Sequence, residues 1–356
     1  MKRSQCLFHA NPWVRFVRFK ASSSIQQQQP RSKFSTKSDL HSYQPLQTLK
    51  DASVAHFRER SFIPGLPTIL PRAHFQNLPA FERWFHPSTS RLNTTYLEQH
   101  GADAFVPLEL TQPPTQSDDA HAEPSFRHFH APLSLFLQWI RAAETEPQTS
   151  QLYLAQCQLL DLPAILRDDF PTPELVAQAG RGDVYDTNVW IGYPPTYTPL
   201  HRDPNPNLFV QLAGQKVVRL LAPDDGQAVF ASVRRQLGQR ADRGAAAFRG
   251  EEMMQGQERA LLERAVWGDD RDLSTPAHGY EARLEAGDGM FIPSGWWHSI
   301  KGVGEGVTAS VSTLPIALVQ VSGNGLALLT SYRSIGGSGS LSKKCRRQVY
   351  SIYQYK

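Results

Sequence analysis

The chain has 356 residues, of which 40% are hydrophobic, so it is long enough to bury the core of one large domain or those of two small ones. Its formal net charge of +4 comes from its two ends. Residues 1–38 carry eight Lys or Arg, residues 331–356 carry six, and neither segment contains an acid. Residues 39–330 therefore have a net charge of −10, which argues against nucleic acid as a partner without excluding it.

The three cysteines lie far apart and form no CxxC pair, so neither a disulfide framework nor a thiolate zinc site is expected. No segment has the uninterrupted apolar run of a membrane-spanning helix, since the nearest candidate, residues 314–329, is broken by polar residues and glycines. We therefore expect no membrane association.

The N-terminal segment, residues 1–38, is rich in Arg, Ser and Gln, and places Trp13, Phe16 and Val17 at helical spacing. This composition is typical of a mitochondrial presequence. The alternative is a basic tail without a targeting role, in which case the protein would reside in the cytoplasm or the nucleus.

The first half of the folded region combines helices with strands. Apolar runs between residues 63 and 85 predict a strand and then a helix, and residues 92–110 predict a short helix that stops at Gly101 before a strand. Residues 131–143 have the apolar periodicity of an amphipathic helix, and residues 151–156 form a strand-like run.

The centre of the sequence is rich in short β-type runs bounded by Gly, Pro or Asp. These runs are residues 186–193, 208–214, 216–223, 287–293 and 306–312. Many short strands separated by turns indicate a sandwich or barrel rather than a parallel sheet. We predict a mainly β domain with added helices over residues 40–318, a helical insert at 224–276 and a disordered tail at 319–356.

A candidate metal site lies in the stretch TPLHRDPNPN, residues 198–207. Residues two apart on a strand point to the same face, so His201 and Asp203 are expected to converge. A His-x-Asp pair is weak by itself, but a later strand leads into SGWWHSI and brings His298 next to it. Two histidines and one carboxylate form the facial triad of non-haem Fe(II) oxygenases, although catalytic zinc accepts the same ligands.

Lys216 begins a strongly apolar strand, where a buried ammonium group needs a fixed anion. The carboxylate of 2-oxoglutarate is such an anion. Thr198 and Tyr153 could contribute neutral hydroxyl donors to the same group. The alternative for Lys216 is a surface lysine that lays its stem along the sheet.

These residues together resemble the JmjC/cupin-8 class of Fe(II)- and 2-oxoglutarate-dependent oxygenases. The motif reads Thr198-x-x-His201-x-Asp203-x-x-x-Asn207-x-Phe209-x-Gln211-x-x-Gly214-x-Lys216, followed by Pro293-x-x-Trp296-Trp297-His298. The resemblance covers roughly residues 60–315 and is strongest to the hydroxylase branch, which includes the asparaginyl hydroxylase acting on hypoxia-inducible factor. It implies a double-stranded β-helix, that is, a jelly-roll or cupin-like core.

The resemblance also implies a role for each matched residue. His201, Asp203 and His298 would ligate iron, and Asn207 would lie beside the metal-bound end of 2-oxoglutarate. The remaining assignments are Lys216, Thr198 and Tyr153 for the distal carboxylate, Trp296 and Trp190 for the pocket wall, and Ser312, where relatives often have Asn, for a contact with the cosubstrate.

The resulting expectation is a dioxygenase that uses Fe(II), 2-oxoglutarate and O₂ to hydroxylate a C–H bond, with no catalytic residue beyond the metal ligands. A protein side chain is the expected substrate. The alternatives are a tRNA-base hydroxylase or a histone demethylase with the same chemistry, and a catalytically inactive cupin that serves as a binding or scaffold module.

Overall fold

The computed structural model describes residues 43–86, 89, 91–113, 124–180, 183–240, 251–268, 279–315, 318–321 and 325–328. The segment 1–38, for which targeting is expected, lies outside the described residues. So do much of the 224–276 insert and most of the C-terminal segment. No helix in the described part of the chain combines the length and the apolar character needed to cross a membrane.

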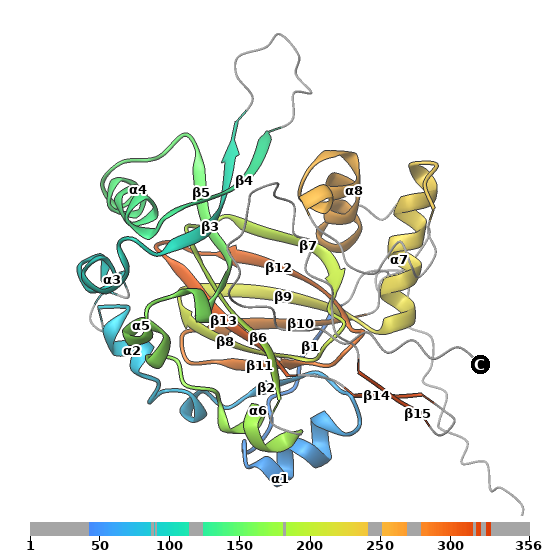
Figure 1. Ribbon diagram of the computed structural model, residues 1–356. Helices are drawn as coiled ribbons and strands as arrows, with labels where there is room; N and C mark the ends of the chain where they lie inside the picture. The colour runs from blue at the N-terminus through green and yellow to red at the C-terminus, as the bar shows by residue number, and fades with distance from the viewer. Residues whose placement is uncertain are drawn as a thin grey trace, which may run out of the picture. The chain divides into compact units, whose positions relative to one another are not determined.

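Strands dominate the described structure (Figure 1). They are β1 (Tyr43–Pro45), β2 (Thr68–Leu70), β3 (Phe105–Gln112), β4 (Ser125–Pro132), β5 (Gln151–Gln158), β6 (Val184–Gly192), β7 (Thr196–Arg202), β8 (Asn207–Ala213), β9 (Gln215–Leu221), β10 (Gly279–Glu285), β11 (Gly289–Ile292), β12 (Trp297–Val303), β13 (Thr308–Pro315), β14 (Leu318–Val321) and β15 (Gly325–Leu328).

The helices lie mostly in the first half of the chain and in the insert. The α-helices are α1 (Val54–Phe57), α2 (Pro79–Arg83), α3 (Thr94–Gly101), α4 (Leu133–Thr145), α5 (Ala164–Asp168), α6 (Glu174–Ala179), α7 (Pro223–Gln236) and α8 (Gly256–Trp267). A π-helical turn, Arg58–Phe62, and the 3₁₀ turns Arg72–His74, Leu159–Asp161 and Glu251–Met254 complete the set.

Two sheets form the core of the fold. One has eight strands in the order β2-β11-β8-β13-β6-β5-β3-β4, and the other has five in the order β1-β10-β9-β12-β7. Between β6 and β9, and again between β10 and β13, successive strands alternate between the two sheets. This alternation is the winding of a double-stranded β-helix, so the predicted mainly β, cupin-like fold is confirmed.

The predicted central runs fall on β6, β8, β9, β11 and β13. Strand β8 is buried along its whole length, and β9 follows after the single residue Gly214, whose φ is +63°. A Cβ atom at Gly214 would lie 2.5 Å from the carbonyl oxygen of Val307, so the turn requires glycine both for its backbone conformation and for space.

Strands β4 and β10 were not predicted from the sequence. In β10 the buried Ala282 and Leu284 alternate with Glu281 and the exposed Arg283, which leaves too few apolar residues to signal a strand. Strand β4 is an edge strand, and half of its eight residues are exposed. Both strands are held by pairing with neighbouring strands rather than by their own hydrophobicity.

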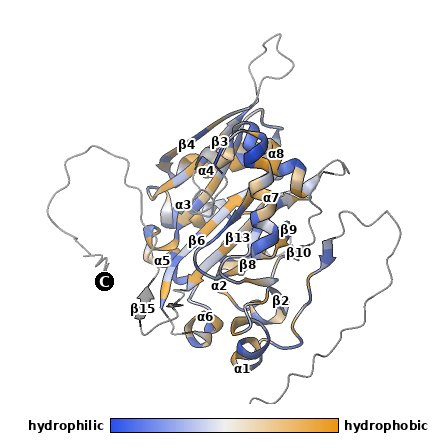
Figure 2. Cartoon of the chain, turned by 90° about the vertical axis from the view of Figure 1, so that its right-hand side faces the viewer, coloured by the Kyte–Doolittle hydropathy of each residue, from blue (hydrophilic) through white to orange (hydrophobic). Residues whose placement is uncertain are grey.

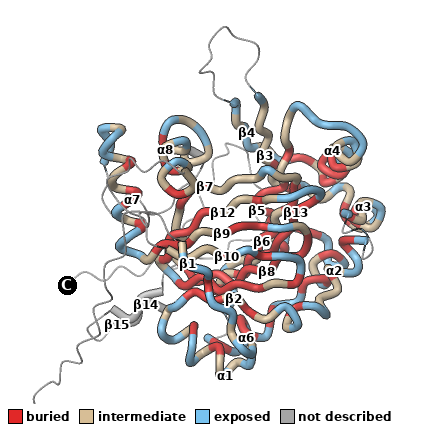
Figure 3. Tube along the Cα trace, turned by 180° about the vertical axis from the view of Figure 1, so that it is seen from behind, coloured by how far each residue is buried: buried red, intermediate tan, exposed pale blue. Residues whose placement is uncertain are grey.

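Helices cover the outer faces of both sheets. The predicted amphipathic helix is α4, which buries Leu133, Phe136, Leu137 and Ile140 against β3, β4 and β5. Helices α7 and α8 lie within the predicted insert 224–276 and pack on the five-stranded sheet. Figure 2 shows the mixed polar and apolar colouring of these helices, and Figure 3 shows that the buried residues concentrate in the central strands.

A disordered tail is expected over residues 319–356, and part of this segment is described. Strands β14 and β15 pair with each other as an antiparallel hairpin within residues 318–328. The rest of the segment 319–356 lies outside the described residues.

The space between the two sheets is filled in part by apolar side chains. Phe209, Met290 and Ile292 from the eight-stranded sheet meet residues of the five-stranded sheet, namely Val218, Leu220, Ala282 and Leu284. Polar residues share this interior with them, and these polar residues form the candidate site.

Candidate active site

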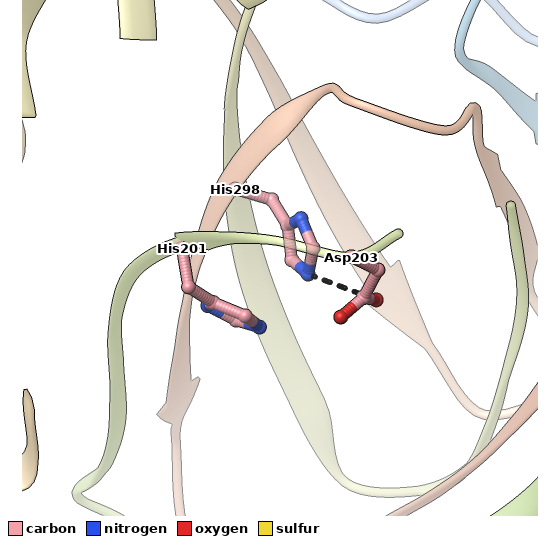
Figure 4. Close-up of side chains that lie close together, drawn as sticks. All are labelled: His201, Asp203 and His298. Carbon is pink, nitrogen blue, oxygen red and sulfur yellow. Dashed lines mark ion pairs between the residues drawn. The ribbon is translucent and has the colours of Figure 1, made fainter. Parts of the chain in front are cut away.

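The predicted metal ligands come together at the end of two neighbouring strands. His201 is the penultimate residue of β7, Asp203 follows that strand, and His298 is the second residue of β12. One ligand atom from each residue lies within 4.8 Å of the other two. Figure 4 shows the three side chains directed toward a common point.

The sheet pairing explains how His298 reaches the other two ligands, as the sequence predicted. The strand that precedes β12 in the chain, β11, belongs to the eight-stranded sheet, whereas β12 belongs to the five-stranded sheet. There β12 pairs with β7, and His201 is the register partner of His298. The histidines therefore meet through direct antiparallel pairing, which places opposite side chains on the same face.

Two contacts fix the backbone around Asp203. Pro204 and Pro206 follow it, and neither can donate a backbone hydrogen bond to continue β7. The amide of Gly295 donates to the Asp203 carbonyl at 3.3 Å, and the Ser294 hydroxyl donates to the Pro204 carbonyl at 2.7 Å. The turn before β12 is thus tied to the segment that carries the carboxylate ligand.

Both imidazole rings are oriented by backbone carbonyl groups. His201 Nδ1 lies 2.8 Å from the Pro199 oxygen, and His298 Nδ1 lies 3.3 Å from the Trp296 oxygen. A proton on Nδ1 that is donated to a carbonyl leaves Nε2 with a lone pair for a metal. His298 Nε2 lies 3.8 Å from Asp203 Oδ2.

His298 is held in the neutral state that coordination requires. Burial, together with the neighbouring His201, lowers the pKa of His298 to about 4. The two imidazoles and one carboxylate suit Fe(II) bound on one face, and the same donors also suit zinc. Within the described ranges, no other group of His, Cys, Asp and Glu gathers three potential ligands.

Lys216 is buried in the same interior and is 3% exposed. Its Nζ donates to the Ser310 hydroxyl at 2.7 Å and to the Tyr153 hydroxyl at 3.4 Å, and it lies 5.4 Å from the centroid of the Phe209 ring. None of the carboxylates among the described residues pairs with it. Burial lowers the pKa of the Lys216 ammonium to about 7, because no carboxylate among the described residues opposes the effect of burial.

Tyr153 is packed closely into this end of the site. Its ring lies over Gly192, where a Cβ atom would come within 2.3 Å of the ring. Burial raises the pKa of the Tyr153 phenol, with Glu109 adding to the effect and a hydrogen bond with Thr196 opposing it. The phenol therefore stays protonated and available as a donor.

Thr198 lies on β7, and Asn207 is the first residue of β8. Thr198 shares the interior face of β7 with Thr196, and its own hydroxyl makes no hydrogen bond with the described residues. Asn207 Nδ2 donates to Asp203 Oδ2 at 3.3 Å, while its buried Oδ1 has no partner in the described protein. Asn207 thus orients the carboxylate ligand.

Ser312 and the two tryptophans occupy three different positions. Ser312 is buried two residues after Ser310, on the same face of β13. Trp296 is buried in the apolar cluster behind the site, and its Nε1 donates to the Gly65 carbonyl at 3.1 Å. Trp190 is half-buried, with its ring centroid 6.1 Å from that of Tyr153.

Sequence reasoning missed Ser310 and Thr196, the hydroxyl groups that contact Lys216 and Tyr153. A local signal existed for Ser310, because the alternation in Ser310-Val311-Ser312 puts both serines on one face. No local signal showed that Thr196 rather than Thr198 would contact Tyr153. The contact depends on which residue of β7 lies opposite Gly302 in the neighbouring strand, and that residue is Thr196.

The chain was compared with known proteins. A family model described as a cupin-like domain (Cupin_8) matches residues 55–313. Lysine-specific demethylase JMJ30 of Arabidopsis thaliana is 26% identical over 70% of this chain and 50% of the relative. Jumonji C domain-containing protein 5 of Drosophila melanogaster is 25% identical over 70% of this chain and 55% of the relative.

A shorter match, to lysine-specific demethylase 8 of Danio rerio, is 39% identical over 80 residues, or 22% of this chain and 20% of the relative. The chain thus spans about half the length of the curated relatives that it matches over most of its own. The matched residues include the metal triad, and the two sheets have the expected winding. This chain belongs to the cupin-like domain family, and the relatives that it matches carry lysine-specific demethylase and Jumonji C names.

Proposed function

We propose that this protein is an Fe(II)- and 2-oxoglutarate-dependent oxygenase that hydroxylates a C–H bond of a protein side chain. The observation that carries the proposal is that the triad and a buried lysine without a counter-anion face one interior. His298 is paired with Leu220, and Gly302 is paired with Lys216, so the two functional residues share a face of the same sheet. Along β9, Lys216 and Leu220 are four positions apart, which corresponds to about 13 Å between their Cα atoms. Long side chains and a five-carbon dicarboxylate can bridge this distance.

The chain supplies ligands, orientation and a dry environment. When bound, Fe(II) supplies the activation of O₂, coupled to decarboxylation of 2-oxoglutarate to succinate and CO₂. His201, Asp203 and His298 would hold the metal on one side, which leaves its other positions open. Asn207 keeps Asp203 aligned through its amide donor.

The distal carboxylate of 2-oxoglutarate would bind at Lys216. The ammonium group already has hydroxyl neighbours in Tyr153 and Ser310, so an incoming carboxylate completes a network of donors that is in place. Hydrogen bonds between charged groups in a buried site are stronger than those between neutral groups. The apolar side chains of Phe209 and Val218 exclude water from this network.

A protein substrate is supported by three features. The body of the chain is acidic, with −10 over residues 39–330. The sequence motif resembles the hydroxylase branch of the family. Several relatives carry the name lysine-specific demethylase, which favours demethylation as a second candidate. Both activities begin with hydroxylation of a C–H bond, since an N-methyl group oxidised in this way is lost as formaldehyde.

A mitochondrial location is part of the proposal and rests on the basic, acid-free composition of residues 1–38. Import of a fluorescent protein fused to this segment, compared with a fusion that lacks it, would test the assignment.

Turnover separates the oxygenase from an inactive scaffold. The purified protein with Fe(II) should convert 2-oxoglutarate to succinate, followed by NMR, and His201→Ala should abolish this conversion. His128→Ala, which changes an exposed histidine outside the triad, is the matched control and should retain activity. No succinate formation by wild type or by His201→Ala would support the scaffold, whereas equal formation by both would show that the conversion does not depend on the triad.

A further inference from the structure

Asn188 is a buried amide side chain that the proposed chemistry does not use. It lies in the middle of β6 and is 4% exposed. Its Oδ1 is buried without a hydrogen-bond partner in the described protein. Buried carbonyl oxygens are almost always hydrogen-bonded, so an unpaired one indicates that a ligand or water completes it.

The sheet register places Asn188 in the same interior as the cosubstrate site. The contact of Ser310 with Lys216 identifies the interior face of β13. Ser312, two residues later, shares that face, and Asn188 is its register partner on β6. On the other side of Ser312, the register partner on β8 is Phe209, whose ring lies beside Lys216.

Asn188 is nevertheless separate from the part of the interior where 2-oxoglutarate is proposed to bind. Tyr153 lies in that part and packs on Gly192, the last residue of β6. Asn188 lies four residues before Gly192, toward the start of the strand, where Val184 and Tyr185 are exposed. It therefore lies between the cosubstrate end of the interior and the solvent-exposed end of β6.

The neighbours of Asn188 on this face have a consistent chemistry. Alternation along β6 gives one wall the residues Asp186, Asn188 and Trp190, that is, a carboxylate, an amide and a half-buried aromatic ring. Asp186 accepts a hydrogen bond from Gln158 Nε2 at 3.0 Å and contributes a negative charge at the outer end. Carbonyl oxygen, carboxylate and ring face all favour a cationic N–H donor.

We propose that Asn188 is a specificity-determining residue whose Oδ1 accepts a hydrogen bond from the side-chain nitrogen of a basic substrate residue, lysine or arginine. Trp190 packs along the aliphatic part of that side chain, and Ser312 lies beside the nitrogen. The proposal rests on the oxygenase function, because the substrate carbon must then lie near the metal. Beyond that function, the proposal assigns a role in substrate recognition to Asn188. It also requires the substrate side chain to be positively charged, a requirement that does not come from the metal or from 2-oxoglutarate.

The test is a binding experiment that needs no turnover. The full-length protein is loaded with Mn(II) and 2-oxoglutarate, and its affinity is measured for short peptides that differ only in their central residue. The central residues are lysine, norleucine, arginine and citrulline, so that each basic residue has a neutral counterpart of similar length. Variants Asn188→Leu and Asn188→Asp are compared with Gln178→Leu, which makes the same amide-to-apolar change on the exposed surface of α6.

The expected result is that wild type and Gln178→Leu bind at least one basic peptide about tenfold or more tightly than its neutral counterpart. Asn188→Leu should abolish this preference while it still binds the neutral peptides, and Asn188→Asp should keep or increase it. Equal affinity for basic and neutral peptides in wild type, including no measurable binding of either, would overturn the proposal. So would an unchanged preference in Asn188→Leu, or a loss confined to 2-oxoglutarate affinity.

Failure of the oxygenase function has a different signature. In that case the wild-type protein would form no succinate from 2-oxoglutarate with Fe(II), whatever peptides it binds. If it does form succinate and shows no preference for basic peptides, only the role of Asn188 is refuted.

Discussion

His201 and His298 are register partners on the antiparallel strands β7 and β12, and their ring centroids lie 4.2 Å apart. Ninety-seven positions of sequence separate them, including the insert that carries α7 and α8. The pairing of the two strands therefore builds two-thirds of the metal site, and Asp203 completes it from the turn that ends β7.

Removal of the Asp203 carboxylate should weaken metal binding more than removal of the Asn207 side chain that orients it. Asp203→Asn keeps the shape of the side chain but removes the negative charge, so we expect the affinity for Mn(II) or Fe(II) to fall by at least about tenfold. Isothermal titration calorimetry with Mn(II) would measure this. Retention of wild-type affinity would show that Asp203 is not a ligand.

Asn207 should affect the affinity for the metal indirectly, through the orientation of Asp203. Its Nδ2 donates to Asp203 Oδ2 at 3.3 Å, so Asn207→Ala leaves all three ligands in place but loses their alignment. We expect a loss of metal affinity of about tenfold, smaller than that of Asp203→Asn. The same titration, with both variants side by side, checks the order. If Asn207→Ala costs as much as the ligand change, the assignment of Asn207 as an orienting residue is wrong.

Lys216 should govern cosubstrate affinity and leave metal binding intact. A charge-assisted hydrogen bond contributes about 1.5–3 kcal/mol, so Lys216→Met should raise the KM for 2-oxoglutarate by roughly tenfold to a hundredfold. Lys301→Met is the matched control, because Lys301 pairs with Glu263 of α8 rather than with a group in the interior. An unchanged KM in Lys216→Met would remove this lysine from the binding site.

The binding of 2-oxoglutarate should depend on pH through Lys216. Its pKa of about 7 in the empty site lies below the ordinary value for lysine, because burial favours the neutral amine. The carboxylate binds the ammonium form, which predominates below pH 7 and is depleted above it. Affinity should therefore fall by up to tenfold per pH unit above about pH 7, and calorimetry in several buffers should show proton uptake. Lys216→Met should bind weakly with no such slope, and a pH-independent affinity in wild type would contradict the prediction.

The free energy of unfolding should depend on Asp169, a fully buried carboxylate that is not part of the candidate site. Its carboxylate accepts hydrogen bonds from Arg83 at 2.7 Å, from the Trp84 ring nitrogen at 2.8 Å and from the Tyr96 hydroxyl at 2.9 Å. Asp169→Ala should lower the free energy of unfolding by about 3 kcal/mol, because Trp84 loses its acceptor in a buried environment. Urea denaturation would measure the change, with Asp168→Ala as the exposed control. A loss below about 1 kcal/mol would show that water replaces the carboxylate.

The sequence was informative about the site because the site uses rare residue types at regular spacing. His201 and Asp203 are two apart, and Lys216 stands at the start of an apolar strand where only a functional reason explains a cation. Strand periodicity is a local property, so it could be read without knowing the partners of each strand. The mainly β fold followed from the same short apolar runs.

Contacts between distant strands could not be read in this way. Ser310 reaches Lys216 across 94 positions of sequence, and Thr196 rather than Thr198 hydrogen-bonds with Tyr153. The strands β4 and β10 also escaped prediction, since their stability comes from their neighbours. The resemblance to the hydroxylase branch rests on the motif alone, whereas the relatives found carry demethylase and Jumonji C names.

By itself the sequence determined which residues could hold a metal and a dicarboxylate, because residue chemistry and the two-residue period of a strand are local. Only the tertiary structure decided which of them meet and what surrounds them. The register between strands fixes the approach of His298 to His201, the hydroxyl groups around Lys216 and the unpaired amide of Asn188. Register is set by packing of the whole core, and no single segment encodes it.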